Sequence, residues 1–389
     1  MFAIAVCSTF VTRFLHSADW QLGMTRHFLS GEAQARFSAA RIEAIGTIGA
    51  VAIEKGCSFV VVCGDVFETN QVERQVIVRA LDAMKATPRV DFYLLPGNHD
   101  PLDAGSIYKS KTFLDHCPSN VKVLMNSDPV PVEPGLEIIG VPWVNKKPTS
   151  DIVARAISEL VPDSTLRVVV GHGAIDSLVH LSKNPSDIGL LGLETSIAEG
   201  KIHYVALGDR HSTTCLGTTG RVWYSGTSEV TDYDELDPGN VLLVDLDADS
   251  IEVETIHVGT WRFVREHFEL AREADCESVE RYLGELVDKS RTVVKLSLIG
   301  QLSLSDMARL DLVLENASDL LGGLETWERR SDLVALPDSG DLERLGLVGF
   351  AAEALEDLRV QGEGNGEQAL MARDALGLLY RLAGPGKRS

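Results

Sequence analysis

Short apolar runs alternate with amphipathic segments along the first half of the chain. Five β-rich runs cover residues 13–19, 59–65, 92–100, 168–172 and 204–211, and each ends in a side chain that can bind a metal ion. Between them, apolar residues recur with helical spacing over residues 32–55, 71–86 and 151–161. Strands that alternate with helices predict an α/β domain.

The polar residues that end these runs follow a common pattern. Glycine comes before the polar side chain in several of them, as in Gly64-Asp65 and Gly171-His172. Glycine allows a sharp backbone turn, and open α/β sheets bind ligands at the carboxyl edge of their strands. We therefore expect the ends of the five runs to meet in one cleft. The residues concerned are Asp19, Asp65, Asn98, His99, His172, Asp209 and His211.

The pattern changes after residue 215. Strand-like runs at 222–226, 241–245 and 251–256 follow one another with turns between them, and they predict a second, more antiparallel sheet that packs on the first. Trp261-Arg262-Phe263 then leads into a predicted helix, followed by a strand at 292–298 and a helix at about 304–318. Two further helical stretches, at about 340–360 and 367–383, form a tail whose apolar face packs on its own domain or on a partner helix.

A length of 389 residues favours two domains plus a tail. The predicted division is a domain at 12–261, a small α+β domain at 262–340 and the helical tail at 341–389. Residues 1–11 are apolar but lack the basic segment and cleavage pattern of a signal peptide, so we expect a disordered or misassigned start. No run approaches the roughly 20 apolar residues of a membrane-spanning helix, which argues against a membrane.

Charge and cysteine content narrow the functional classes. The formal net charge is −21, so nucleic acid could be bound only through a local basic patch, through the metals or through a partner subunit. The six cysteines show no C-x-x-C pair, which is typical of free thiols in a reducing cytoplasm.

The ordered set of polar residues suits a two-metal site. Asp65 would bridge the two cations; Asp19 and His211 would complete one metal, and Asn98 and His172 would hold the other. His99 follows Asn98, so we expect its ring in the same cleft, where it would stabilise the transition state or protonate the leaving oxygen. A lone Gly-Asp is more often a turn, and His172 after three valines resembles a core histidine. Five ordered blocks favour the metal site over these readings.

Five motifs resemble the blocks of the calcineurin-like metallophosphoesterases: Asp19-Trp20-Gln21, Gly64-Asp65, Gly97-Asn98-His99-Asp100, Gly171-His172 and Gly208-Asp209-Arg210-His211. The flanking residues 14–23 and 64–67 narrow the resemblance to the SbcD-type DNA repair exonucleases. It implies a four-layer α/β/β/α sandwich with a small α+β capping domain and C-terminal helices. It also implies two ligand sets: Asp19, Gln21, Asp65 and His211 for the first metal, and Asp65, Asn98, His172 and Asp209 for the second.

The chain departs from this family pattern at two ligand positions. Gln21 stands where the family has histidine, and a neutral amide oxygen should bind the first metal more weakly. Asp209 also replaces a histidine, and its charge should favour hard ions at the second site while making that metal a poorer Lewis acid. We therefore expect two divalent ions, Mn²⁺ foremost, with Mg²⁺, Fe²⁺ and Zn²⁺ as alternatives.

The resemblance implies a metal-dependent DNA exonuclease or endonuclease in DNA repair. It further implies an SbcC-like coiled-coil ATPase as partner, and a homodimer. Two alternatives stay open: a phosphodiesterase or phosphatase for another phosphate ester, and a catalytically weak scaffold that binds DNA ends. Arg210, between two predicted ligands, is the candidate contact for a substrate phosphate.

Overall fold

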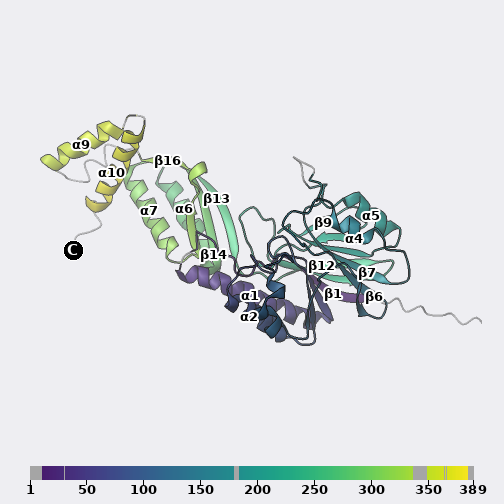
Figure 1. The fold of residues 1–389 in the computed structure, drawn as a ribbon. Coiled ribbons are helices and arrows are strands. Elements are labelled where there is room, and N and C mark those ends of the chain that lie inside the picture. The colour runs from purple at the N-terminus through teal and green to yellow at the C-terminus, as the bar shows by residue number, and fades with distance from the viewer. Residues whose placement is uncertain are drawn as a thin grey trace, which may run out of the picture. The chain divides into compact units, whose positions relative to one another are not determined.

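The computed structural model describes residues 11–29, 31–178, 184–335, 348–362, 364 and 366–383 (Figure 1). The expectation for residues 1–11 and the boundary near residue 340 therefore lie almost wholly outside the described residues. The chain divides into two compact units. The first comprises residues 1–26 and 34–261, and the second comprises residues 27–33 and 262–389.

The first sheet of the first unit has six strands in the order β12-β11-β1-β2-β3-β4. Its strands are β1 (Thr12–Ser17), β2 (Phe59–Val62), β3 (Asp91–Leu94), β4 (Val121–Val123), β11 (Asn240–Leu246) and β12 (Ile251–His257). β1 to β4 are parallel, whereas β11 runs antiparallel to both β1 and β12. Of the parallel strands, β2 and β3 are apolar along nearly their whole length, as expected when both faces of a sheet are covered.

The second sheet has the order β5-β6-β7-β8-β10-β9. Its strands are β5 (Val130–Glu133), β6 (Leu136–Gly140), β7 (Leu166–His172), β8 (Tyr204–Gly208), β9 (Thr214–Leu216) and β10 (Val222–Tyr224). The four central strands, β6, β7, β8 and β10, are parallel, and β5 and β9 add antiparallel edges. This direction brings the carboxyl ends of β7 and β8 to one edge.

Three hydrophobic clusters separate four layers. One lies between the first sheet and the helices α1 (Gly31–Lys55), α2 (Arg74–Lys85) and α3 (Lys111–His116). A second, with Phe14 and Val61 facing Val168 and Tyr204, fills the space between the sheets. The third packs α4 (Ile152–Ile157) and α5 (Leu190–Ala198) on the second sheet. The predicted α/β/β/α sandwich is confirmed.

The sheet assignment of the strands after residue 215 was wrong in part. β10 joins the second sheet, but β11 and β12 extend the first. The reason is that β11 is apolar on both faces. Val241 and Leu243 contribute to the cluster under the helices, whereas Leu242 and Val244 contribute to the cluster between the sheets. Such a strand is stable only inside a layered sandwich, and there it pairs with β1.

The second unit contains a small parallel sheet. Its strands are β13 (Arg262–Leu270), β14 (Thr292–Leu302), β15 (Gly323–Thr326) and β16 (Asp332–Ala335), and β14 pairs with the other three. The helices α6 (Glu273–Glu285) and α7 (Leu304–Ser318) share a core with it. The sequence did not predict β13, because charged residues interrupt its apolar positions and resemble the start of a helix.

The remaining described elements are short or helical. The 3-10 turns are η1 (Ile107–Lys109), η2 (Lys289–Arg291) and η3 (Glu328–Arg330), and the last two helices are α9 (Phe350–Gly362) and α10 (Glu367–Ala383). Leu355 and Leu376 of these helices pack with Leu304 of α7, which favours packing on their own unit. Within the described part of the chain, no helix has the length and apolar character needed to cross a membrane.

A buried histidine in β1 makes the stability of the fold depend on pH. His16 is fully buried, its Nδ1 lies 3.0 Å from the Tyr204 hydroxyl, and its Nε2 donates to the Leu207 carbonyl at 3.1 Å. Burial lowers its pKa to about 3. The unfolded chain takes up a proton near pH 6.5 but the folded chain does not. This contribution to the unfolding free energy therefore falls as pH drops below 6.5, by about 1.4 kcal/mol per pH unit.

We expect His16→Gln to make the loss of stability between pH 7 and pH 4 shallower than in the natural chain. Urea unfolding at several pH values measures the two slopes. His116→Gln, which changes an exposed histidine at the end of α3, should leave the slope unchanged. Equal slopes in all three proteins would show that His16 does not remain neutral in the folded state.

Candidate metal centre

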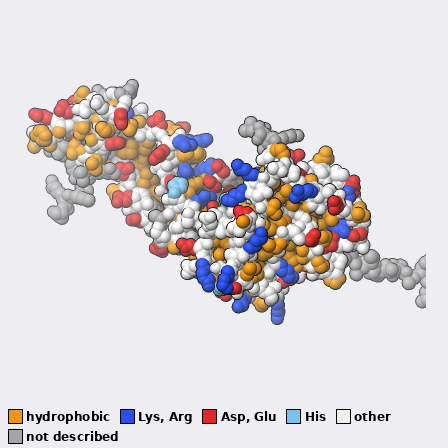
Figure 2. All heavy atoms as spheres, in the orientation of Figure 1, with side chains coloured by type: hydrophobic (Ala, Val, Ile, Leu, Met, Phe, Trp, Pro, Cys, Tyr) orange, Lys and Arg blue, Asp and Glu red, His pale blue; other side chains and the backbone are white. Residues whose placement is uncertain are grey.

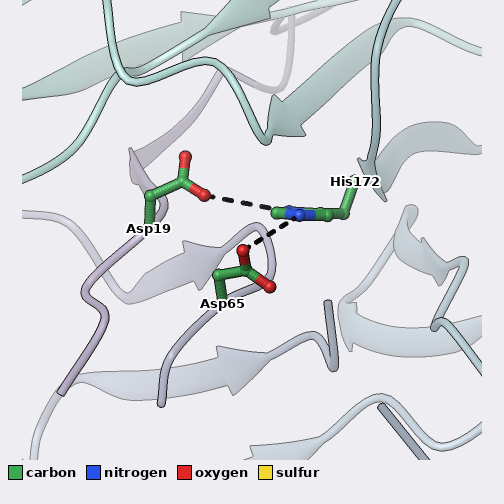
Figure 3. Close-up of side chains that lie close together, drawn as sticks. All are labelled: Asp19, Asp65 and His172. Carbon is green, nitrogen blue, oxygen red and sulfur yellow. Dashed lines mark ion pairs between the residues drawn. The ribbon is translucent and has the colours of Figure 1, made fainter. Parts of the chain in front are cut away.

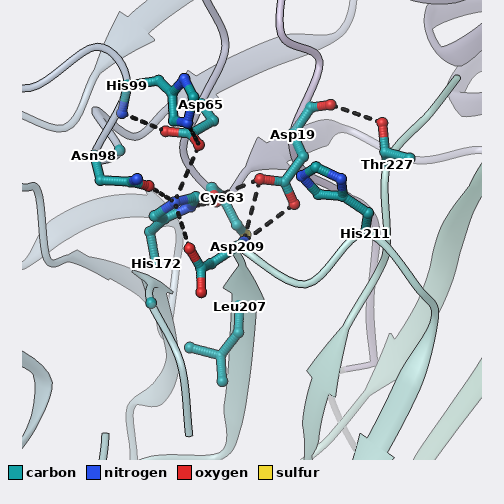
Figure 4. Close-up of polar contacts among 12 residues, drawn as sticks. Asp19, Cys63, Asp65, Asn98, His99, His172, Leu207, Asp209, His211 and Thr227 are labelled. Carbon is teal, nitrogen blue, oxygen red and sulfur yellow. Dashed lines mark hydrogen bonds and ion pairs between the residues drawn. The ribbon is translucent and has the colours of Figure 1, made fainter. Parts of the chain in front are cut away.

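The candidate site lies where strands of both sheets end (Figure 4). β1 leads to Asp19 and Gln21, β2 to Asp65, and β3 to Asn98 in the first sheet, and β7 ends at His172 in the second. Asp209 and His211 follow β8. Parallel strands in each sheet present their carboxyl ends at one edge, so residues far apart in sequence arrive together.

The backbone at the site takes an unusual conformation. Asp19, Gln21, Asp65 and Asp209 all have positive φ, at 52°, 44°, 50° and 99°. Non-glycine residues rarely adopt this region, and such strain is concentrated at functional sites. Close approach also requires a glycine beside them, because a Cβ on Gly208 would lie 1.8 Å from the Cys63 carbonyl oxygen.

Asp19, Asp65 and His172 form the centre of the cluster and point toward one another (Figure 3). Ligand atoms of the three lie within 4.8 Å of each other, and all three residues are buried. His172 Nε2 lies 3.4 Å from Asp65 Oδ2, and His172 Nδ1 lies 4.0 Å from Asp19 Oδ1. His172 Nδ1 also donates to the Cys63 carbonyl at 2.8 Å, which fixes the ring.

Burial and mutual charge shift the protonation of these groups. Burial raises the pKa of Asp19 to about 7. Burial also acts to raise the pKa of Asp65, but the charge and hydrogen bond of His172 outweigh it and lower the pKa below its usual value. The pKa of His172 is raised well above its usual value, because the Asp65, Asp19 and Asp209 carboxylates outweigh the opposing effect of burial. The pocket thus favours a compensating positive charge.

Asn98 and Asp209 extend the cluster around His172. Asn98 Oδ1 lies 2.6 Å from His172 Nε2, and Asp209 Oδ1 lies 3.7 Å from the same nitrogen. The Asp209 amide donates to both carboxylate oxygens of Asp19, at 3.2 and 3.1 Å. Three oxygens, including that of Asp65, therefore surround one ring nitrogen. This concentration of acceptor atoms fits a divalent cation.

Gln21 and His211 lie on the other side of Asp19. Gln21 Nε2 is 3.1 Å from His211 Nε2. The other amide atom, Gln21 Oε1, is buried and has no hydrogen-bond partner among the residues that the structure describes. An unpaired buried oxygen is costly unless something binds it. A cation beside Asp19 would satisfy it, so the donor set fits the first metal too.

His99 lies at the rim of the cluster. Its amide donates to Asp65 Oδ1 at 2.9 Å, its Nδ1 donates to the Glu68 carbonyl at 3.0 Å, and its Nε2 lies 3.9 Å from Asp65 Oδ2. Its ring is 40% exposed, so the Nε2 side is open to a substrate. Asp100 holds this loop in place, because its carboxylate accepts hydrogen bonds from the Gly97 amide and the Tyr108 hydroxyl.

The predicted role of Arg210 has no support from a contact. Its Nε donates to Thr214 Oγ1 at 2.8 Å, in β9, and not to a described member of the cluster. Contact with a substrate phosphate remains a prediction. His16, three residues before Asp19, is not a free donor for this site, because both of its ring nitrogens are engaged by Tyr204 and Leu207.

Two residues near the site were not predicted from the sequence. Glu235 lies 2.8 Å from His211 Nδ1, and buried Arg41 of α1 donates to the carbonyls of Trp20 and Val230 at 2.9 and 2.7 Å. Glu235 is one acidic residue in an acidic stretch, and Arg41 is one arginine in a helix. Neither has a spacing that distinguishes it in the sequence.

Comparison with known proteins identifies a family for this chain. The model of the calcineurin-like phosphoesterases matches residues 12–251. The SbcD component of the SbcCD nuclease of Rhodobacter capsulatus is 31% identical over 93 residues. That alignment covers 23% of this chain and 22% of the relative, so the chain matches less than a quarter of the relative's length.

Solved structures that this chain matches include TT1561 of Thermus thermophilus, at 12% identity and a TM-score of 0.40, covering 64% of this chain and 100% of that one. A dimetal phosphatase from Danio rerio is 11% identical with a TM-score of 0.37, covering 64% and 99% of the two chains. The family match extends over more than half of the chain and includes every residue of the cluster. The chain therefore belongs to the calcineurin-like phosphoesterase family, whose members hydrolyse phosphate esters at a dinuclear metal site.

Proposed function

We propose that this chain is a metal-dependent DNA nuclease, exonucleolytic or endonucleolytic, that acts in DNA repair. The convergence of Asp19, Asp65 and His172 in one buried cluster supports the hydrolytic chemistry. The partial similarity to a component of a nuclease supports DNA as the substrate. Residues 262–340 would act as a capping domain and residues 341–389 as a helical tail.

The residues of the cluster would divide between two cations. The first metal would be held by Asp19, Gln21, Asp65 and His211, and the second by Asp65, Asn98, His172 and Asp209. When bound, the cations supply Lewis acidity toward the phosphate and lower the pKa of water. Mn²⁺ is the ion we expect, because oxygen donors dominate both sets and favour hard ions over Zn²⁺.

His99 would handle the proton of the leaving group. Its Nδ1 proton is held by the Glu68 carbonyl, so Nε2 is the atom that lies toward Asp65 and the open side of the site. In its doubly protonated form, with a second proton on Nε2, it would donate that proton to the leaving oxygen and become neutral, or stabilise negative charge on the phosphate.

The acidity of the chain bears on how DNA would be held. The net charge is −21, and Figure 2 shows acidic side chains scattered among basic ones over the face in view. Since phosphate contacts supply much of the affinity for DNA, we propose that an SbcC-like coiled-coil ATPase partner, and a second copy of the chain, contribute to the grip.

Turnover of linear DNA and of a small aryl phosphodiester in Mn²⁺, Mg²⁺ or Zn²⁺ tests the proposal. Cleavage of DNA above the level of the metal-free protein would support it. Hydrolysis of the small ester alone would point to a phosphodiesterase or phosphatase for another substrate. Fewer than two bound metals together with no hydrolysis would indicate a scaffold that binds DNA ends, which Gln21 and Asp209 would explain.

Gln21→His should raise the affinity of the first metal site, because an imidazole nitrogen is a stronger ligand than an amide oxygen. We expect activity at limiting Mn²⁺ to rise by about tenfold, and activity at saturating Mn²⁺ to change less. Gln21→Leu, which offers no donor atom, should shift the Mn²⁺ dependence the other way. If Mn²⁺ titrations of all three proteins coincide, Gln21 is not a ligand.

A further inference from the structure

Glu235 is a buried carboxylate directly behind His211. Its side chain is 6% exposed, and Oε1 lies 2.8 Å from His211 Nδ1. The Thr231 amide donates to Oε2 at 2.8 Å, and the Thr231 hydroxyl also donates to Oε1. The same hydroxyl oxygen lies 2.7 Å from His211 Nδ1. Among the described residues, each group in contact with this ring nitrogen is therefore an acceptor.

This arrangement decides which ring nitrogen of His211 carries the proton. An ionised carboxylate can only accept, and the Thr231 hydroxyl has already given its proton to Glu235, so Nδ1 must be the donor. In the neutral ring the lone pair then lies on Nε2. Gln21 Nε2, 3.1 Å away, donates to that lone pair. The amide of Gln21 is thereby oriented, and its Oε1 is left as the buried oxygen without a partner among the described residues.

We infer that Glu235 is a positioning residue for the first metal of the proposed centre, on which this inference rests. By holding the proton of His211 on Nδ1, Glu235 keeps Nε2 available as a ligand and sets which atom of Gln21 is presented to the cation. A carboxylate behind a ligating imidazole also makes the ring a stronger ligand. This support compensates in part for the amide at position 21.

The segment that carries Glu235 is anchored to the rest of the site. Arg41 bonds to the carbonyls of Trp20 and Val230, one residue before Gln21 and one before Thr231. The Leu236 amide donates to the Ser212 hydroxyl at 2.9 Å, next to His211. These contacts hold Glu235, His211 and Gln21 on one rigid frame, which a positioning role requires.

Glu235→Gln tests the inference, because the amide fills the same space but can donate to Nδ1 as well as accept from it. Nitrogen-15 NMR of the metal-free full chain reports the His211 tautomer, and Mn²⁺ titration followed by electron paramagnetic resonance reports metal affinity. We expect a loss of the Nδ1–H tautomer and a rise of about tenfold in the Kd of the weaker Mn²⁺ site. Glu235→Asp should recover part of the affinity.

Glu229→Gln is the matched control. Glu229 is also a buried carboxylate in the same segment, but it accepts from Thr260 and Trp261 instead of His211. The Glu229→Gln variant should leave the His211 tautomer and the Mn²⁺ affinity unchanged. If it does not fold, Asp245→Asn, beside Arg13, replaces it as the control.

Two results would overturn the inference. The first is a Glu235→Gln variant with an unchanged His211 tautomer and a Kd for Mn²⁺ within twofold of the natural chain. The second is that the effects of Gln21→Ala and Glu235→Gln on the Kd for Mn²⁺ are additive, because residues that act through His211 should couple. Asp65→Ala separates this failure from that of the proposed centre. If Asp65→Ala abolishes Mn²⁺ binding while Glu235→Gln does not alter it, the centre stands and the role of Glu235 falls. If neither variant alters Mn²⁺ binding, the proposed centre itself is wrong.

Discussion

Asp65→Ala should reduce phosphodiester hydrolysis by about 10³-fold or more and release bound metal. Removing a single stabilising donor from an active site costs about 10²–10³-fold, and Asp65 is the one carboxylate assigned to both cations. Asp65 also accepts a hydrogen bond from the His99 amide, so the substitution removes a contact that holds the loop of His99, the proposed acid. Turnover and metal content after purification are the two measurements.

The matched control for this variant is Asp245→Asn. Asp245 is on β11 and forms an ion pair with Arg13 at 2.6 Å, away from the cluster. The Asp245→Asn variant should retain both metals and full turnover. If Asp65→Ala keeps two equivalents of metal, another residue bridges the cations and the assignment of the shared ligand is wrong.

His99→Ala should behave differently, with intact metal content and a loss of turnover of about 10²-fold. This is the low end of the range for removal of a positioned proton donor. The difference follows from geometry, since the ring touches the Glu68 carbonyl and the edge of Asp65 but lies at the open rim. Single-turnover rates at saturating Mn²⁺ measure the loss.

His116→Ala, which changes an exposed histidine in the first unit, is the control for His99→Ala and should leave turnover unchanged. A substrate with an activated aryl leaving group adds a second test, because such a group needs no proton. The effect of His99→Ala should be smaller on that substrate if His99 acts as the acid. Loss of metal from His99→Ala would instead identify His99 as a ligand.

The sequence predicts that the polar residues at the strand ends come together, because its signals are local. A buried strand, a glycine and a ligand stand together in the chain, as in Gly64-Asp65 and Gly171-His172, so each block could be recognised without knowledge of the others. The parallel sheets then bring the blocks together. The helices α1 and α2 were predicted for a similar reason, since their apolar positions recur with helical spacing.

The errors concern relations between distant residues. Nothing within residues 240–257 indicates that β11 pairs with β1 instead of forming a separate sheet; that choice depends on which faces the sandwich leaves to be covered. β13 has charged residues on its partly exposed face, so its pattern is not apolar enough to identify a strand. The role proposed for Glu235 depends on its contact with His211, and the sequence around Glu235 does not reveal that contact.

The pairing of β11 with β1 has a consequence for the order of folding. Thr12 is the register partner of Leu246, so β1 cannot pair along this edge until β11, which is synthesised much later, is available. On the ribosome, where chains grow at about 5–20 residues per second, β1 would have an unpaired edge for roughly ten seconds or longer. The apolar side chains that β11 contributes to two cores are missing throughout that interval. Nascent chains of this protein therefore expose an unpaired strand edge and incomplete cores during that interval, which makes this stage prone to aggregation.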